Sequence, residues 1–166
     1  MKINFAYGLG AGILMATVDG LNYYYLYDTT FGKFAFFINL AILISAIFTG
    51  IKHISRQKFN GEIPYNQATL SGILISVYTG FILGAFNYIY FTFANQEYIT
   101  YIIDVSREFM MQQEESPEAV QTRITELQTG FTPFKQAINS LKWTFILGLF
   151  ISLISGIIVR KKSTQK

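Results

Sequence analysis

Four long apolar segments constrain the fold of this chain more than any other feature of its sequence. They run over residues 3–26, 34–51, 70–93 and 141–159, to within a few residues. A helix needs about 20 mostly apolar residues to cross a bilayer, within a range of roughly 17–25. Because lipid offers no partners to backbone amides, each segment must satisfy its own hydrogen bonds as a helix. The sequence therefore predicts an all-α integral membrane protein, a four-helix bundle that crosses the bilayer four times.

The composition supports this prediction. The chain of 166 residues is 51% hydrophobic and 14% charged, whereas a soluble domain is roughly 25% charged. A chain of this length suits one domain, so we expect a single membrane domain over residues 1–166. We expect the first segment to be a retained helix rather than a signal peptide. Its apolar character continues to Leu26, and no small-x-small cleavage site is followed by polar sequence.

The charges between the segments predict the orientation. The connection after the second segment and the C-terminal tail are basic, with Lys52, Arg56, Lys58, Arg160, Lys161, Lys162 and Lys166 against Glu62. The connection after the third segment instead holds seven of the chain's acids. Since short basic loops stay in the cytoplasm, we expect a multi-pass protein of the cytoplasmic (inner) membrane with both termini cytoplasmic.

The long acidic connection is predicted to form an extracytoplasmic helical hairpin over residues 95–131. Apolar residues recur at helical spacing on the first arm (Tyr98, Ile102, Val105, Phe109) and on the second (Val120, Ile124, Leu127). The first repeat indicates that the helix of the third segment continues past the membrane. Each arm is expected to bury its apolar stripe against the other arm or against the lipid headgroups. Ser116 and Pro117 resemble an N-cap and a first-turn proline. The second arm should end near Gly130, and Thr132 with Pro133 repeats the start signal before the last segment.

Small residues recur at every fourth position on three of the segments. The stripes are Gly8, Gly12, Ala16 and Gly20; Ala68, Gly72, Ser76, Gly80 and Gly84; and Thr144, Gly148, Ser152 and Gly156. Such stripes let helix backbones approach closely in lipid. They predict a tightly packed bundle, and they leave open whether the stripes pack within one chain or between copies.

The polar residues that cost most in lipid are Asp19, Asn22, Asn39 and Asn87. Helical phase places Asp19, Asn39 and Asn87 on the packed sides of their segments, each roughly 8–9 Å below the outer boundary. Lys142 lies at a similar depth and is close enough to pair with Asp19. One interpretation is a pocket for a headgroup, ion or small solute. The other, which we favour, is an interhelical hydrogen-bond layer with contacts of about 0.6–2 kcal/mol each.

Several kinds of site are excluded or not expected. The chain has no cysteine, which excludes disulfides and thiolate metal sites. The only histidine, His53, lies in a basic run and is expected to be a solvated loop residue, so we expect no metal and no cofactor. Nucleic acid is not an expected partner, because the basic residues adjoin the membrane segments and suit anionic lipid headgroups at the cytoplasmic face.

The sequence resembles the DUF4199 family of bacterial membrane proteins over nearly its whole length. The resemblance rests on the glycine-rich first segment, on the long acidic connection, and on Ile63-Pro64-Tyr65-Asn66-Gln67-Ala68 before the third segment. It implies a bacterial host of the Bacteroidetes lineage and a cytoplasmic-membrane address. That family has no established activity, so the resemblance implies no catalytic residue.

The function that the sequence favours is a non-enzymatic accessory or scaffold protein, acting through its bundle and its acidic hairpin. Its expected partners are membrane lipids and either another membrane protein or a second copy of the chain. The alternative is a small transporter, or a lipid- or solute-binding protein, that uses the polar layer around Asp19. An enzyme is not expected, because the sequence contains no nucleophile–base pair and no phosphate-binding loop.

Overall fold

A computed structural model describes residues 1–23 and 34–159 of the chain. Its helices are α1 (Lys2–Leu21), α2 (Ala35–Lys58), α3 (Tyr65–Ile89), the π-helix η3 (Tyr90–Ala94), α4 (Glu97–Gln112), α5 (Pro117–Gly130) and α6 (Pro133–Val159). These described ranges contain no strand. The prediction of an all-helical protein is therefore confirmed.

Three helices are long and apolar enough to cross a membrane: α2, α3 together with η3, and α6. The described part of α1 is not among them, because Asn4, Asp19 and several glycines dilute its apolar character. Its predicted end at Leu26 lies outside the described residues, as does the basic C-terminal tail. Crossing of the bilayer by the first segment therefore stays a prediction.

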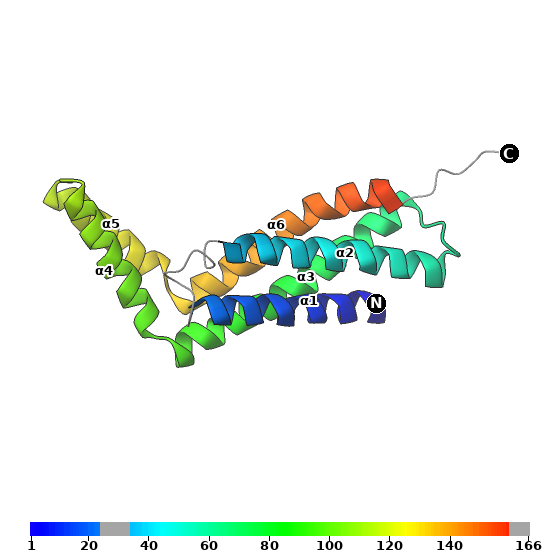
Figure 1. Cartoon of the computed structure of the whole chain (residues 1–166), viewed down its shortest axis with the longest axis horizontal. Coiled ribbons are helices and arrows are strands. Elements are labelled where there is room, and N and C mark those ends of the chain that lie inside the picture. The colour runs from blue at the N-terminus through cyan, green and yellow to red at the C-terminus, as the bar shows by residue number, and fades with distance from the viewer. Residues whose placement is uncertain (24–33, 160–166) are drawn as a thin grey trace. The chain divides into compact units, whose positions relative to one another are not determined.

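The chain divides into two compact units, one made of Met1–Leu83 with Ser140–Lys166 and the other of Gly84–Asn139. The first unit contains α1, α2, most of α3 and most of α6. In this unit α1 and α2 run side by side (Figure 1). The second unit contains α4, α5 and the adjoining ends of α3 and α6. The expectation of a single domain stays a prediction.

Helix α6 buries small and polar side chains and exposes large apolar ones. Its buried residues are Thr144, Gly148, Ser152, Ser155 and Gly156. Its residues that are more than half exposed include Trp143, Phe150, Ile154, Ile157 and Ile158. Helices of water-soluble proteins show the reverse pattern. This distribution fits surroundings of hydrocarbon, where association depends on close backbone packing rather than on burial of large apolar groups.

Paired glycines and serines bring α3 and α6 together. Gly72 of α3 faces Ser152 of α6, and Gly148 of α6 faces Ser76 of α3. A methyl group added at either glycine would collide with the opposing serine side chain. The stripes on these two helices therefore pack against each other within one chain.

The stripe on α1 packs against α3. A methyl group added at Gly8 would lie 2.5 Å from Tyr78 Cβ, and one at Gly12 would lie 2.6 Å from Ile82 Cβ. Thr79 Oγ1 donates a hydrogen bond of 3.3 Å to the Gly8 carbonyl. These contacts place the two backbones close together, as small residues in membrane helices allow.

The other glycines singled out in the sequence have different surroundings. A methyl group at Gly80 would meet Leu141 Cα at 3.4 Å, and one at Gly156 would meet Thr69 Oγ1 at 2.7 Å. Gly20 is half-buried, and Gly84 is buried in the second unit. Two further stripe positions, one on α3 and one on α6, therefore also serve packing within the chain.

The second helix is longer than predicted. It continues to Lys58 instead of ending at residue 51, so residues 52–58 are helical rather than a loop. Ile54 and Ser55 are buried while Arg56 is exposed. The apolar face thus continues beyond the last fully apolar stretch, which is why hydrophobicity alone placed the end two turns too early.

The second unit has a core of its own. Ile103 of α4 packs with Ile124 and Leu127 of α5, and Val120 and Phe131 complete the cluster. The Ser116 side chain accepts a hydrogen bond of 3.3 Å from the backbone of Ala119, and α5 ends at Gly130. The predicted cap, apolar face and end of the second arm are therefore confirmed.

The first arm differs from the prediction in two ways. It does not continue α3, because η3 and a break at Asn95 (φ −144°, ψ 69°) separate the two helices. The residue that packs on α5 is Ile103, at 8% exposure, whereas Val105 and Phe109 of the predicted stripe are 43% and 61% exposed. The arm has apolar residues on two faces, and spacing alone does not show which one meets α5.

Candidate functional site

Asp19 and Asn39 meet across the α1–α2 pair. Asn39 Nδ2 donates a hydrogen bond of 2.6 Å to Asp19 Oδ1, and both residues are half-buried. They come from helices that run in opposite directions, as the separate contact between Tyr7 and His53 at the other end of the pair shows. The structure thus brings together two of the residues predicted to form a polar layer.

Two amide oxygens near this contact have no partner. Asn22 lies one helical turn after Asp19. Its Oδ1 and that of Asn39 are buried without a hydrogen bond to any residue that the structure describes. Leaving a buried polar atom unsatisfied costs about 1–3 kcal/mol. These two oxygens therefore have the capacity to accept a further hydrogen bond.

The other two members of the predicted layer, Asn87 and Lys142, have different surroundings. Asn87 is buried, at 3% exposure, within the second unit. Lys142 is exposed, and its Nζ lies 5.7 Å from the ring centroid of Trp143. Between the described residues Lys142 and Asp19 no ion pair forms. Lys142 precedes the buried Thr144 by two positions, so it faces away from the packed side of α6.

His53 is not the solvated loop residue that the sequence predicted. It lies within α2 and is half-buried. The Tyr7 hydroxyl and His53 Nδ1 are 3.1 Å apart, and the two rings meet edge to face at a centroid distance of 5.7 Å. Gly50, one turn earlier on α2, lies against the Tyr7 ring. Sequence reasoning missed this pair because it joins residues 46 positions apart.

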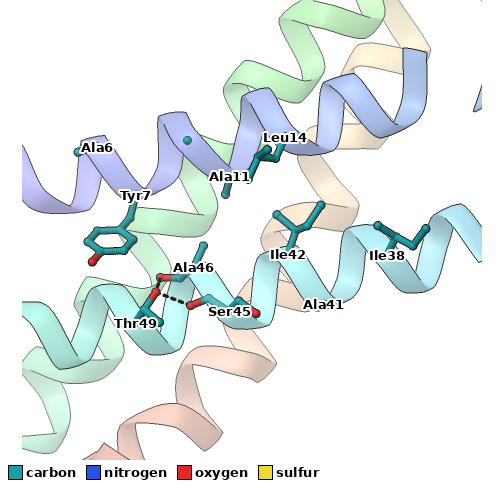
Figure 2. Close-up of a pocket in the computed structure, with 11 residues that line it drawn as sticks. Ala6, Tyr7, Ala11, Leu14, Ile38, Ala41, Ile42, Ser45, Ala46 and Thr49 are labelled. Atoms are coloured by element: carbon teal, nitrogen blue, oxygen red, sulfur yellow. Dashed lines mark hydrogen bonds between the residues drawn. The ribbon is translucent and has the colours of Figure 1, made fainter. Parts of the chain in front are cut away.

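A groove of about 670 Å³ lies between α1 and α2. Figure 2 shows its two walls, formed by Ala6, Tyr7, Gly10, Ala11 and Leu14 of α1 and by Ile38, Ala41, Ile42, Ser45, Ala46 and Thr49 of α2. A methyl group added at Gly10 would meet open space. The available signal in the sequence was Gly10 itself, which stands two positions out of register with the stripe that packs on α3.

The arrangement around Asp19 can join two helices and can offer hydrogen-bond acceptors. A carboxylate that accepts from a neighbouring helix's amide ties the two helices at one level. Among the residues that the structure describes, no group of three or more His, Asp or Glu could hold a metal ion. The groove, in contrast, offers mainly apolar surface.

Comparison with known proteins identifies a family but no described activity. The model of a family described as "Protein of unknown function (DUF4199)" matches residues 6–161. No curated protein and no solved structure matches the chain. The family match extends from α1 to the end of α6 and includes the groove, the Asp19–Asn39 contact and the hairpin. The chain belongs to the DUF4199 family.

Proposed function

We propose that this chain is a non-enzymatic accessory or scaffold protein of the bacterial cytoplasmic membrane. It crosses the bilayer four times, keeps both termini in the cytoplasm, and binds a partner protein through its α4–α5 hairpin. Three apolar helices of sufficient length support the membrane location. The charge distribution of the connections supports the orientation.

The polar groups inside the first unit support a structural role for that unit. Asn39 donates to Asp19 between α1 and α2, and Thr79 donates to the Gly8 carbonyl between α3 and α1. Ser152 donates to a carbonyl one turn earlier in its own helix. These polar side chains are engaged in helix packing and in local hydrogen bonds rather than arranged around a reactive centre.

The observation that carries the proposal is the exposed apolar hollow on the hairpin. The hairpin has its own core, yet Val105 and Phe109 remain outside it and line a hollow of about 740 Å³. Arg123 and Glu126 stand at this hollow and form an ion pair with an N–O distance of 3.0 Å. Exposed aromatic residues beside charged ones are typical of protein-binding surfaces.

Photo-crosslinking in living bacteria tests this proposal. A benzophenone amino acid at Phe109 should crosslink one membrane or extracytoplasmic protein, while the same probe at Gln121, exposed but outside the hollow, should not. Adding Val105→Asp should abolish the crosslink, because it places a charge in the apolar hollow without touching Ile103 in the core. Equal products from both positions, or lipid adducts alone, would contradict a specific partner surface.

A second candidate function is supported by the two unpaired oxygens of Asn22 and Asn39. A transporter, or a lipid- or solute-binding protein, would use them with Asp19 as a polar pocket. Because the chain has no cysteine, an Asp19→Cys variant carries a single reactive thiol. Labelling by a water-soluble maleimide from the outer side would favour a pocket. No labelling, with Gln121→Cys labelled in parallel, would favour the structural role.

A further inference from the structure

The basic end of α2 continues the face that lines the groove. On α2 the groove residues Ala41, Ser45 and Thr49 follow one another at intervals of four. Residues three or four positions apart lie on the same face of a helix. The next positions on this face are Lys52 and then Arg56, both exposed. The apolar groove therefore ends at two cations on the same helix face.

Lys52 and Arg56 also line a hollow of their own. It has a volume of about 280 Å³ and is completed by Ser55, Gly61, Phe48, Ile158 and Val159. The two cationic side chains, a serine and a glycine form its polar part, and Phe48 with the end of α6 forms its apolar part. In the sequence α6 is followed at once by Arg160, Lys161 and Lys162. This hollow suits an anionic group that is attached to something apolar.

The length of the groove fits one lipid chain. From Thr49 to Ile38 the α2 wall rises by 11 residues, which is about 16 Å at 1.5 Å per residue. The hydrocarbon core of a bilayer is about 30 Å thick, so one leaflet is about 15 Å deep. A helix of a second copy would cross both leaflets and would need a groove about twice as long. The groove thus matches the chain of a lipid better than it matches a second protein.

We infer that the α1–α2 pair binds one anionic phospholipid. Its phosphate is held at Lys52 and Arg56, and one acyl chain lies in the groove beside Gly10, Ala41 and Ser45. The Tyr7–His53 pair stands at the boundary between these two parts. This site lies at the opposite end of the α1–α2 pair from Asp19, and it rests on the proposal that these helices lie in a membrane.

Native mass spectrometry of the full-length protein in mild detergent tests this inference. Phosphatidylglycerol and phosphatidylcholine with identical acyl chains are titrated separately. We expect one phosphatidylglycerol per chain, bound more tightly than phosphatidylcholine. Removing both cations in Lys52→Gln/Arg56→Gln should weaken phosphatidylglycerol binding by about thirtyfold. Each cation near an anionic surface contributes about 1 kcal/mol to binding, and about 1.4 kcal/mol corresponds to a tenfold change in affinity. Binding of phosphatidylcholine should weaken much less, because its choline cation offsets the charge of its phosphate.

Lys58→Gln is the matched control for the cations. It removes one charge from the same helix end, but position 58 lies on a different face of α2 from Lys52 and Arg56. It should leave the preference for phosphatidylglycerol intact. An equal loss in Lys58→Gln, or no loss in the double variant, would overturn the headgroup assignment. Displacement of phosphatidylglycerol by inorganic phosphate would assign the hollow to a free anion instead.

Filling the groove tests the position of the acyl chain. Gly10→Leu should weaken binding of both lipids at least tenfold, because its side chain enters open space that the acyl chain would occupy. Ala41→Leu fills the opposite wall and gives a second test if Gly10→Leu does not fold. Unchanged lipid binding in both variants would refute the groove. If these variants instead lose a dimer of the chain, a second copy of the chain occupies the groove.

These results are separable from the proposed function. The crosslink from Phe109 depends on the hairpin, whereas lipid binding depends on α1 and α2. If the crosslink persists in Gly10→Leu, a failed lipid experiment leaves the partner surface standing. If the crosslink fails, lipid retention can still be measured on the purified chain.

Discussion

At the scale of single residues, the meaning of Asp19 depends on its neighbour. An acid at membrane depth marks a functional site by default, but here its carboxylate accepts from the amide of Asn39 at 2.6 Å. The carboxylate oxygen of aspartate and the carboxamide oxygen of asparagine can both accept this hydrogen bond with the same geometry. A structural contact would therefore survive loss of the charge, whereas a site that needs the charge would not.

Asp19→Asn should melt within a few degrees of the wild-type protein, while Asp19→Leu should melt clearly lower. The leucine leaves the Asn39 amide without its acceptor, which removes an interhelical hydrogen bond of about 0.6–2 kcal/mol. A thermal-shift assay in detergent measures both variants. Equal destabilisation by the two substitutions would show that the charge itself holds the helices together.

Gly12 and Gly10 offer a matched test of helix packing, two positions apart on α1. Alanine at Gly12 would place its Cβ 2.6 Å from Ile82 Cβ, whereas alanine at Gly10 would meet nothing within 4 Å. Overpacking costs about 1–3 kcal/mol, and both substitutions gain the same helix propensity. Gly12→Ala should therefore lower the melting temperature relative to Gly10→Ala. Identical melting temperatures would mean that the close contact between α1 and α3 at Gly12 contributes nothing to stability.

At the scale of helices, local signals predicted ends better than they predicted faces. Ser116 marks the start of α5, because an N-cap acts through the nearest backbone groups, and the helix ends at the predicted Gly130. On α4 the spacing did not single out the residue that meets α5, which is Ile103 rather than Phe109. Which face of a helix is buried depends on the helix that packs against it, and the sequence around the first helix does not contain this information.

Loss of the cap at Ser116 should open the first turn of α5. Ser116→Ala removes the acceptor for the Ala119 amide and should cost about 1 kcal/mol. Hydrogen exchange should then speed up at residues 119–122, with little change in α1 and α2. Ser116→Asp should restore protection, since aspartate is also a good N-cap. Faster exchange in both variants would assign the effect to the loop rather than to the cap.

The candidate site shows the same division between local and distant information. Helical phase placed Asp19 and Asn39 on the packed sides of their helices, and the structure brings them into contact. The Tyr7–His53 pair was not predicted, because it depends on α2 extending to Lys58. The groove was not predicted either. Gly10 differs from the packed glycines of α1 only in its register, and register alone does not show whether another helix fills the space beside it.

At the scale of the whole molecule, the distribution of side chains argues for lipid. Ser76, Thr79 and Ser152 are fully buried, while Phe81 and Phe150 are 60% and 61% exposed. In water this arrangement would leave large apolar surface exposed, at about 25 cal/mol for each Å². In hydrocarbon the same surface costs nothing to expose, and the small residues allow close packing.

The number of crossings decides whether the two ends of the chain share a side of the membrane. Four crossings place both termini in the cytoplasm, because the connection after α2 is basic. Three crossings, by the helices that qualify on length and composition alone, would place the N-terminus outside. Fluorescent-protein fusions at either terminus should therefore both be fluorescent, and alkaline phosphatase inserted at Glu114, in the α4–α5 turn, should be active. Phosphatase activity of an N-terminal fusion would show that α1 does not cross, whereas an inactive insertion at Glu114 would place the hairpin in the cytoplasm and reverse the orientation.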